Sequence, residues 1–308
     1  MPFTAKDVQT LREMTGVGMM DCKKALTETD GNMDKAVETL REKGMAAAAK
    51  KASRIAADGM CYAAVSEEDG SAAIIECNSE TDFVAKNEQF IGFVKAVAGA
   101  VIRDNPADIE ALKESDAGNG RTVGAALTDL VLKIGENIQI RRFERYAEPA
   151  NAAYVHMGGK IGVLVHMDVS ENLKGSPAVT ELGRDVAMQI AAMRPLWLDE
   201  NDADANTVAK EREILTAQVK QDEKNAGKPD AVVEKIVEGR VRKYLADVCL
   251  LMQPYVKENK LTVAQHVAEV AKSLGGEIKV TRFTRYEKGE GLEKRVDDLA
   301  AEVAKMVQ

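Results

Sequence analysis

The chain has 308 residues, which is enough for two or three compact units and too many for one small core. Hydrophobic residues make up 45% and charged residues 30%, the balance of an ordinary soluble globular protein. The net charge of −8 argues against direct nucleic-acid binding, because contacts with phosphates need a basic surface. No run approaches the roughly 20 apolar residues that cross a bilayer, and the first residues do not resemble a secretory signal. We therefore expect a cytoplasmic protein without membrane contact.

Cysteines and histidines, which often form metal and catalytic sites, are few and dispersed. The four cysteines contain no CxxC pair, which favours free buried thiols, and none of the three histidines has the spacing of a metal site. His166 ends an apolar run and is interpreted as a structural histidine. The chain lacks a GxxxxGK[ST] phosphate loop, a GxGxxG fingerprint and a GxSxG elbow. We expect no metal, no cofactor and no catalytic residue, so the chain is predicted to bind another protein and not to be an enzyme.

Residues 1–54 are predicted to form an N-terminal domain of three helices, similar to UBA domains. Thr4 followed by Asp7 is typical of a capping box at a helix start. Glycines at 16 and 18 and an Asp-Gly-Asn turn at 30–32 separate the helices, and the alanine- and lysine-rich residues 46–51 are predicted to continue as helix. The apolar residues at helical spacing are Val8, Leu11 and Met14 in the first helix and Met33, Ala36, Val37 and Leu40 in the third.

From residue 60 onward a β-β-α-α-β pattern occurs twice, which predicts an α+β core made of two similar halves. We expect one long helix after the second strand of the first copy, running from Phe83 to Val101. The opening strands of the two copies match at an offset of 89 residues, and the closing strands match at 140, where RFERY at 142–146 parallels RFTRY at 282–286. The second copy is therefore predicted to carry an insertion of 51 residues.

The predicted organisation has four parts after the N-terminal domain. They are a first core half at 55–147, a second core half at 148–204 and 249–287, a helical hairpin at 205–248 and a C-terminal helical module at 288–308. Apolar residues at helical spacing on both sides of a Gly-Lys-Pro turn at 227–229 predict the antiparallel hairpin. Its many charges indicate a solvated surface that contacts a partner or self-associates. The C-terminal helix is predicted from Val296, Leu299, Val303 and Met306.

The segment from Asn78 to Asn87, which joins an apolar strand to a helix, is the strongest candidate site. Local physics offers a structural explanation in which Thr81 caps the helix, Asp82 favours its N-terminal dipole and Phe83 staples it. The matching loop of the second copy, at 168–172, has no counterpart of Asp-Phe. Because a purely structural device should recur in the duplicate, this difference favours a functional role.

Three passages resemble the elongation factor Ts family: Thr81-Asp82-Phe83-Val84, residues 11–26 (LREMTGVGMMDCKKAL) and residues 133–138 (KIGENI). The resemblance covers essentially the whole chain in the same order. It implies a guanine-nucleotide exchange factor for elongation factor Tu that binds the GDP-bound and nucleotide-free forms. The chain departs from the family pattern at Met157, where glycine is common, and at 252–255 (MQPY), where the family begins with Gly and ends with Phe.

The same resemblance implies how the residues divide the work. Phe83 would insert between two helices of the GTPase, while Asp82 would disturb the shell around the magnesium ion and so release GDP. The other implied partner-binding residues are Thr81 and Val84 in the same loop, Met19, Met20 and Lys23 in the N-terminal domain, Ile134 and Gly135 beside the loop, and His156 and Val256 in the second half.

Several alternatives stay open from the sequence. Met19 and Met20 are equally well explained as core residues, although adjacent methionines cannot share one helical face. An enzyme with an unfamiliar site is one other class. Two further classes are a structural oligomer built on the charged hairpin and a translation protein that acts directly on RNA, which the acidic composition disfavours.

Overall fold

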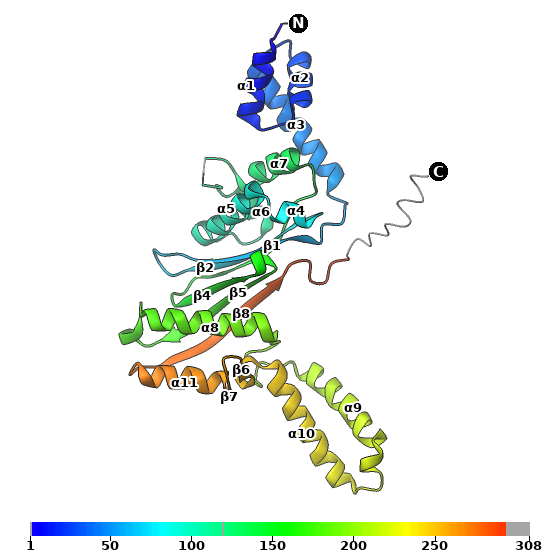
Figure 1. Ribbon diagram of the computed structural model, residues 1–308, viewed down its shortest axis with the longest axis vertical. Helices are drawn as coiled ribbons and strands as arrows, with labels where there is room; N and C mark the ends of the chain where they lie inside the picture. The colour runs from blue at the N-terminus through cyan, green and yellow to red at the C-terminus, as the bar shows by residue number, and fades with distance from the viewer. Residues whose placement is uncertain (1, 119, 294–308) are drawn as a thin grey trace.

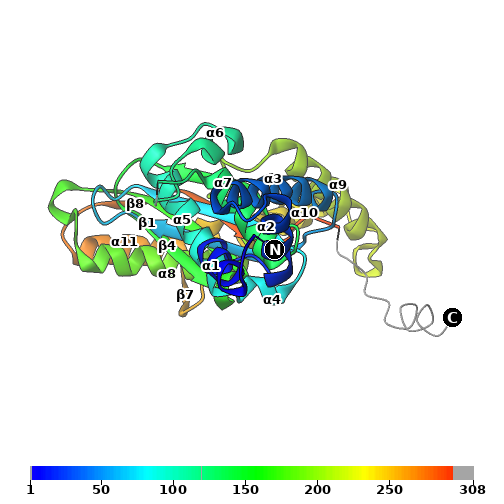
Figure 2. The same ribbon diagram turned by 90° about the horizontal axis from the view of Figure 1, so that it is seen from above.

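A computed structural model describes residues 2–118 and 120–293. Helices and small antiparallel sheets form an α+β protein, as the sequence predicts. The molecule is elongated, with helices α1 to α3 at one end and the pair α9 and α10 at the other (Figure 1). Between these ends lie a helical layer, two stacked sheets and a second helical layer. Seen from above, α3 lies over α7 and the α9–α10 pair projects to one side (Figure 2).

Helices α1 (Ala5–Thr15), α2 (Met19–Glu28) and α3 (Met33–Lys51) open the chain. The predicted capping box is present, because the Thr4 hydroxyl accepts a hydrogen bond from the Asp7 amide and the Asp7 carboxylate accepts one from the Thr4 amide. Residues 46–51 continue α3 as predicted, and α3 contacts α7 of the core. The residues buried between the helices are Val8, Leu11, Val17, Cys22, Ala25, Leu26, Ala36 and Leu40.

The first core half is a sheet in the order β1-β2-β3, covered on one face by helices. Its elements are β1 (Asp58–Val65), β2 (Ala72–Ser79), α4 (Asp82–Ala85), α5 (Glu88–Asp104), α6 (Ile109–Glu114), α7 (Val123–Ile134) and β3 (Gln139–Tyr146). Helices α5 and α7 contribute the aliphatic and phenylalanine side chains that bury the outer face of the sheet. The short helix α6 was not predicted.

The expected single helix from Phe83 to Val101 is wrong, because the chain breaks between α4 and α5. Asn87 has extended backbone angles (φ −74°, ψ 129°), and its side chain caps α5 by accepting hydrogen bonds from the amides of Gln89 and Phe90. Thr81 occupies the N-cap position of α4, but its side chain makes no capping hydrogen bond. The break leaves Phe83 on a separate four-residue turn of helix instead of within the long helix.

The second core half repeats the sheet in the order β4-β5-β8, again with helices on one face. Its elements are β4 (Asn151–His156), η1 (Met157–Gly159), β5 (Ile161–Val169), η2 (Glu171–Leu173), α8 (Pro177–Met193), η4 (Leu250–Met252), β6 (Pro254–Tyr255), β7 (Glu258–Thr262), α11 (Val263–Ser273) and β8 (Ile278–Glu287). The small β6–β7 hairpin was not predicted.

The strand registers correct the predicted offset between the opening strands of the two halves. Cys61 pairs with Glu76 in the first sheet, and Asn151 pairs with His166 at the corresponding place in the second. The opening strands therefore match at 90 residues and not at 89. Both sheets carry a bulge in the closing strand at positions 140 residues apart, where the pairing skips Arg141 and Thr281. A shared irregularity at the same register position supports the interpretation as a duplication.

The inserted segment contains α9 (Ala205–Gln221), η3 (Glu223–Asn225) and α10 (Asp230–Val248). Its two long helices pack against each other through a seam of Val219, Val233, Val237 and Val241, bordered by Val208, Leu215, Ile236 and Leu245. At its base, the buried Gln189 and Gln253 side chains hydrogen-bond to each other. The predicted C-terminal helix at Val296 to Met306 lies outside the described residues.

The two sheets stack on each other through small and aliphatic residues: Cys61, Ala63, Ala72, Ile74 and Leu164, with Tyr146 and Tyr286. At the same interface the halves exchange equivalent contacts. Arg142 stacks on the Tyr286 ring at 4.1 Å, and Arg282 stacks on the Tyr146 ring at 3.9 Å. Burial raises the pKa of Tyr146 to about 12, so its hydroxyl stays protonated at neutral pH. Each half therefore supplies an arginine and a tyrosine to the other.

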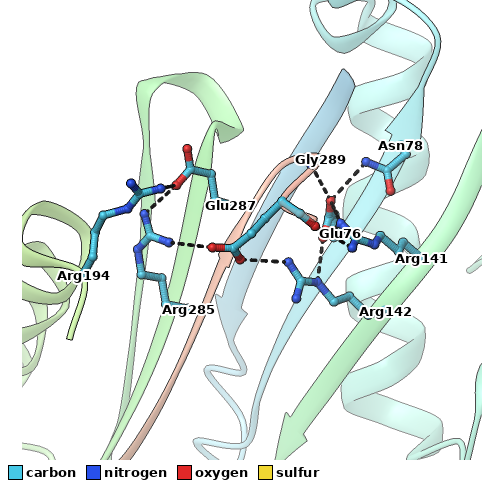
Figure 3. A network of polar contacts seen from close by, with 9 residues as sticks. Glu76, Asn78, Arg141, Arg142, Arg194, Arg285, Glu287 and Gly289 are labelled. Carbon is cyan, nitrogen blue, oxygen red and sulfur yellow. Dashed lines mark hydrogen bonds and ion pairs between the residues drawn. The ribbon is translucent and has the colours of Figure 1, made fainter. Parts of the chain in front are cut away.

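The fully buried carboxylate of Glu76 on β2 joins this sheet to the end of β8 (Figure 3). It accepts hydrogen bonds from Arg141 at 3.0 Å, from Arg142 at 2.6 Å, from Asn78 at 3.1 Å and from the backbone amide of Gly289 at 2.7 Å. Gly289 has φ +68°, and a Cβ there would lie 2.1 Å from the carbonyl oxygen of Ala57, so only glycine permits this approach.

Replacing Glu76 with alanine should lower the free energy of unfolding by roughly 3–5 kcal/mol, because two partly buried arginines and two amide groups lose their common acceptor. Urea denaturation of the full chain measures this change. Glu28→Ala is the control, since Glu28 pairs with Lys43 at 2.6 Å on the surface and its loss should cost about 1 kcal/mol or less. Equal effects of the two substitutions would contradict a special role for the buried carboxylate.

Candidate functional site

The turn of α4 presents one side chain to solvent and buries its neighbour. Phe83 is 79% exposed, the most exposed of the large hydrophobic side chains in the described residues. Val84 is only 6% exposed and belongs to the core beneath the first sheet's helices. Of the four residues predicted from Thr81 to Val84, the structure therefore leaves Phe83 accessible and uses Val84 as an anchor. An exposed phenylalanine on an anchored turn is available to enter a pocket on another molecule.

Asp82 lies next to Phe83 and is paired with Lys86. The Lys86 ammonium lies 2.7 Å from the Asp82 carboxylate and 5.9 Å from the centre of the Phe83 ring. The hydrogen bond from Lys86 holds the pKa of Asp82 below its usual value, so this carboxylate is ionised at neutral pH. The turn therefore carries a negative charge and an apolar ring side by side.

A second loop, which follows α7, holds this turn in place. The Glu136 carboxylate accepts hydrogen bonds from the backbone amides of Glu80 and Thr81 at 3.1 and 3.0 Å and from the Thr81 hydroxyl at 2.6 Å. In return, the Glu80 carboxylate accepts a hydrogen bond from the Asn137 amide at 2.6 Å and pairs with Arg54 at 3.4 Å. Thr81 therefore supports the turn through its hydroxyl. The sequence interpretation missed Glu80, Glu136 and Asn137, although two of them lie within the KIGENI passage.

Ile134 and Gly135 immediately precede this supporting loop. Ile134 ends α7 and is partly buried against the first core, whereas Gly135 is exposed and ends the helix with φ 86°. Because Glu136 binds the backbone of residues 80 and 81, the structure places both residues beside the Phe83 turn. Of the two, only Gly135 is well exposed for contact with another protein.

The predicted residues of the N-terminal domain lie in the first turns of α2. Met19 and Met20 are 44% and 63% exposed, and Lys23 is also exposed. This exposure rules out the alternative that the two methionines are core residues. The Lys133 side chain, in the last turn of α7, lies against Gly16 of the N-terminal domain. This contact connects the N-terminal domain to α7, the helix that precedes the supporting loop.

The two predicted residues of the second half lie in different places. His156 ends β4, and its Nδ1 lies 2.9 Å from the hydroxyl of Tyr154. The η1 turn that follows His156 contacts β1, as does α4. Val256 is 46% exposed next to the β6–β7 hairpin, and its amide donates to the buried Gln189 side chain at 2.8 Å. Figure 1 shows β6 beyond α8, on the other side of the second sheet from α4.

The described residues do not form a metal site or a membrane-spanning helix. Among the described residues, three or more His, Cys, Asp and Glu side chains do not gather anywhere in the manner of a metal site. Within the same ranges, every helix is too short or too polar to span a membrane. The four cysteines are free and buried, as predicted. These observations leave the Phe83 turn as the strongest candidate site.

Comparison with known proteins gives a consistent result. The family model described as elongation factor TS matches residues 80–290. Elongation factor Ts of Clostridium perfringens is 48% identical over 99% of both chains. Elongation factor Ts of Clostridioides difficile is 48% identical over 99% of both chains, and that of Symbiobacterium thermophilum is 49% identical over 98% of this chain and 97% of its own. The chain therefore belongs to the elongation factor Ts family, a family of translation elongation factors.

Proposed function

We propose that this chain is a guanine-nucleotide exchange factor that binds elongation factor Tu and promotes release of GDP during translation elongation. It acts by binding in the cytoplasm and carries out no covalent chemistry. The observation that carries the proposal is Phe83, which is 79% exposed on a turn whose first residue, Thr81, is hydrogen-bonded to Ser79 and Glu136. A large aromatic side chain held at a fixed place on the surface can serve as the anchor that a partner buries.

The physical basis lies in how a GTPase holds its nucleotide. Backbone amides, a lysine and a hydrated Mg²⁺ ion compensate the charge of the phosphates. Phe83 inserts between two helices of elongation factor Tu and displaces the segments that carry these groups. Full burial of a phenylalanine contributes roughly 1.5–3 kcal/mol, which helps to offset the cost of that displacement.

Asp82 supplies the second part of the proposed action. Its carboxylate is ionised and lies next to the inserting ring, so it reaches the partner together with Phe83. There it disturbs the water shell of the Mg²⁺ ion. Loss of the cation leaves the phosphate charge poorly compensated, and GDP dissociates faster. Because Lys86 holds Asp82 at 2.7 Å in the free protein, this ion pair must loosen on binding.

Exchange by this route is reversible and needs no chemical step. A factor that weakens nucleotide binding must itself be weakened by nucleotide, to the same extent. It therefore binds most tightly to the nucleotide-free GTPase and less tightly to the GDP-bound form. Incoming GTP then drives the factor off, and one molecule can serve many cycles.

The remaining surfaces add affinity in this proposal. Met19, Met20 and Lys23 provide a contact through the N-terminal domain, while His156 and Val256 provide contacts through the second half. The hairpin of α9 and α10 buries its apolar seam internally but leaves Ile214 and Val232 exposed at 52% and 41%. Self-association through this hairpin stays a prediction. Direct nucleic-acid binding is not part of the proposal, given the net charge of −8.

The test of the proposal is whether the purified chain accelerates release of fluorescently labelled GDP from elongation factor Tu. A stable oligomer that leaves the release rate unchanged would support the structural alternative instead. Salt-sensitive binding of RNA without acceleration would support direct action on RNA.

Phe83→Ala should weaken both binding to the GTPase and acceleration of GDP release by about 30-fold, which corresponds to roughly 2 kcal/mol for a buried aromatic anchor. The thermal unfolding of the variant should match that of the unchanged chain, because the ring is 79% exposed. Val84→Ala is a useful contrast, since Val84 is buried and its truncation should lower stability. If Phe83→Ala abolishes the cooperative thermal transition, the ring serves as a helix staple and the proposed insertion of Phe83 into the GTPase is wrong.

Asp82→Ala should slow GDP release when Mg²⁺ is present. With Mg²⁺ chelated, the variant should nearly match the unchanged chain, because no cation remains to be displaced. The measurement is GDP release from elongation factor Tu in buffers with and without a chelator. Lys86→Ala serves as the control, since it removes the partner of Asp82 but keeps the carboxylate. Equal impairment of Asp82→Ala in both buffers would rule out the magnesium role.

A further inference from the structure

The two core halves carry the same loop, between the second strand and the long helix, with different lengths. The strands before the loop match at 90 residues, but the helices after it, α5 and α8, match at 89, so the first loop is one residue longer. Val84 and Leu173, 6% and 5% exposed, each anchor the loop in the core of their own half. Phe83, 79% exposed, projects from the first loop beside its anchor. The residues beneath the two loops differ as well.

In the second half the loop lies directly on the backbone before β8. The Ser170 amide donates to the carbonyl of Glu277 at 3.0 Å, and the Glu277 amide donates to the Ser170 hydroxyl at 3.0 Å. Gly276 makes this approach possible, since a Cβ there would lie 2.5 Å from the Ser170 hydroxyl and 2.6 Å from Leu173 Cδ1. A larger residue at 276 would push the loop outward.

In the first half such a larger residue is present. At the closing-strand offset of 140 residues, Glu136 takes the place of Gly276. The amide of Glu80, which matches Ser170, now donates to the Glu136 side chain at 3.1 Å instead of to a backbone carbonyl. The carboxylate also accepts the amide and hydroxyl of Thr81. A side chain therefore stands between the loop and the strand and holds the loop away from it.

We propose that Glu136 is a positioning residue that holds the α4 turn outward and so keeps Phe83 presented to the partner. This inference rests on the proposed function, and it assigns the outward position of Phe83 to one carboxylate. Without Glu136, two backbone amides and a hydroxyl lose their acceptor, and the turn samples other positions. The apparent affinity for the GTPase then falls in proportion to the fraction of molecules that present Phe83.

The first measurement needs no partner. Hydrogen exchange of the full chain should show the Glu80 and Thr81 amides exchanging at least tenfold faster in Glu136→Ala, while the Ser170 and Glu277 amides keep their rates. Glu136→Gln retains an acceptor oxygen and should restore most of the protection. Glu171→Ala is the control, because it removes a carboxylate from the matching loop of the second half, where Glu171 pairs only with Lys174 at the surface. Unchanged exchange at Glu80 and Thr81 in Glu136→Ala would overturn the inference.

The second measurement separates the presentation of Phe83 from its effect on the bound nucleotide. In a titration of GDP release, Glu136→Ala should raise the half-saturating concentration about tenfold while the rate at saturation stays within twofold. Thr81→Val removes only the hydroxyl and should show a smaller shift of the same kind. If Glu136→Ala is too unstable to titrate, Thr81→Val and Glu136→Gln decide the question. A lower saturating rate with an unchanged half-saturating concentration would overturn the positioning role.

A double substitution tests whether Glu136 acts through Phe83. Adding Glu136→Ala to Phe83→Ala should cause no further loss of GDP release, because there is no ring left to present. An equal loss in both backgrounds would show that Glu136 acts elsewhere and would overturn the inference. The failure of the proposed function looks different: Phe83→Ala by itself would leave GDP release unchanged, and the exchange of the Glu80 amide would then still decide whether Glu136 holds the turn.

Discussion

The structure depends on the compensation of one buried charge. Glu76 lies in the central strand of the first sheet with no exposed surface, and a carboxylate in such a place is tolerated only with full hydrogen bonding. Arg141 and Arg142 come from the neighbouring strand, while the Gly289 amide comes from the chain after the last strand of the second sheet. The charge therefore requires the end of the second half to cross onto the first. An ion pair between Lys288 and Asp58 adds a second contact between the same two segments. Figure 3 shows the contacts of Glu76 and Gly289.

The duplication supplies a stable frame because the two halves meet through equivalent surfaces. Small side chains let the sheets approach closely, and each half contributes an arginine that stacks on a tyrosine of the other. This arrangement uses the inner face of both sheets and leaves the outer faces to helices. The loops at the ends of the strands are then free to diverge, since little of the shared interface depends on them. Phe83 and Leu173 occupy one such pair of loops.

Rigidity around Phe83 has a functional meaning. A loop that had to order on binding would lose part of the binding energy as conformational entropy. Here the turn is anchored below by Val84, beside it by Glu136 and at its far end by the Asn87 cap of α5. The exposed ring is thus held before any partner arrives. The proposed exchange activity needs such preorganisation. The binding energy of Phe83 is then available to displace segments of the GTPase and is not lost in ordering its own loop.

The sequence by itself determined the parts that local interactions control. Helix starts such as Thr4 and Asp7, the apolar seam of the hairpin and the repeated strand pattern all depend on residues near one another in the chain, so spacing was enough to predict them. The motif around Phe83 was also visible, since the matching loop of the second copy has no counterpart of Asp-Phe. Tertiary structure decided the rest. The break at Asn87 overrode an apolar periodicity that continued through it, and the register of paired strands corrected the offset to 90 residues. Which of Phe83 and Val84 faces solvent, and the support of that turn by Glu136, depend on contacts across some 55 residues of chain. Such contacts form only when segments that are distant in the chain pack together, and no local spacing records them.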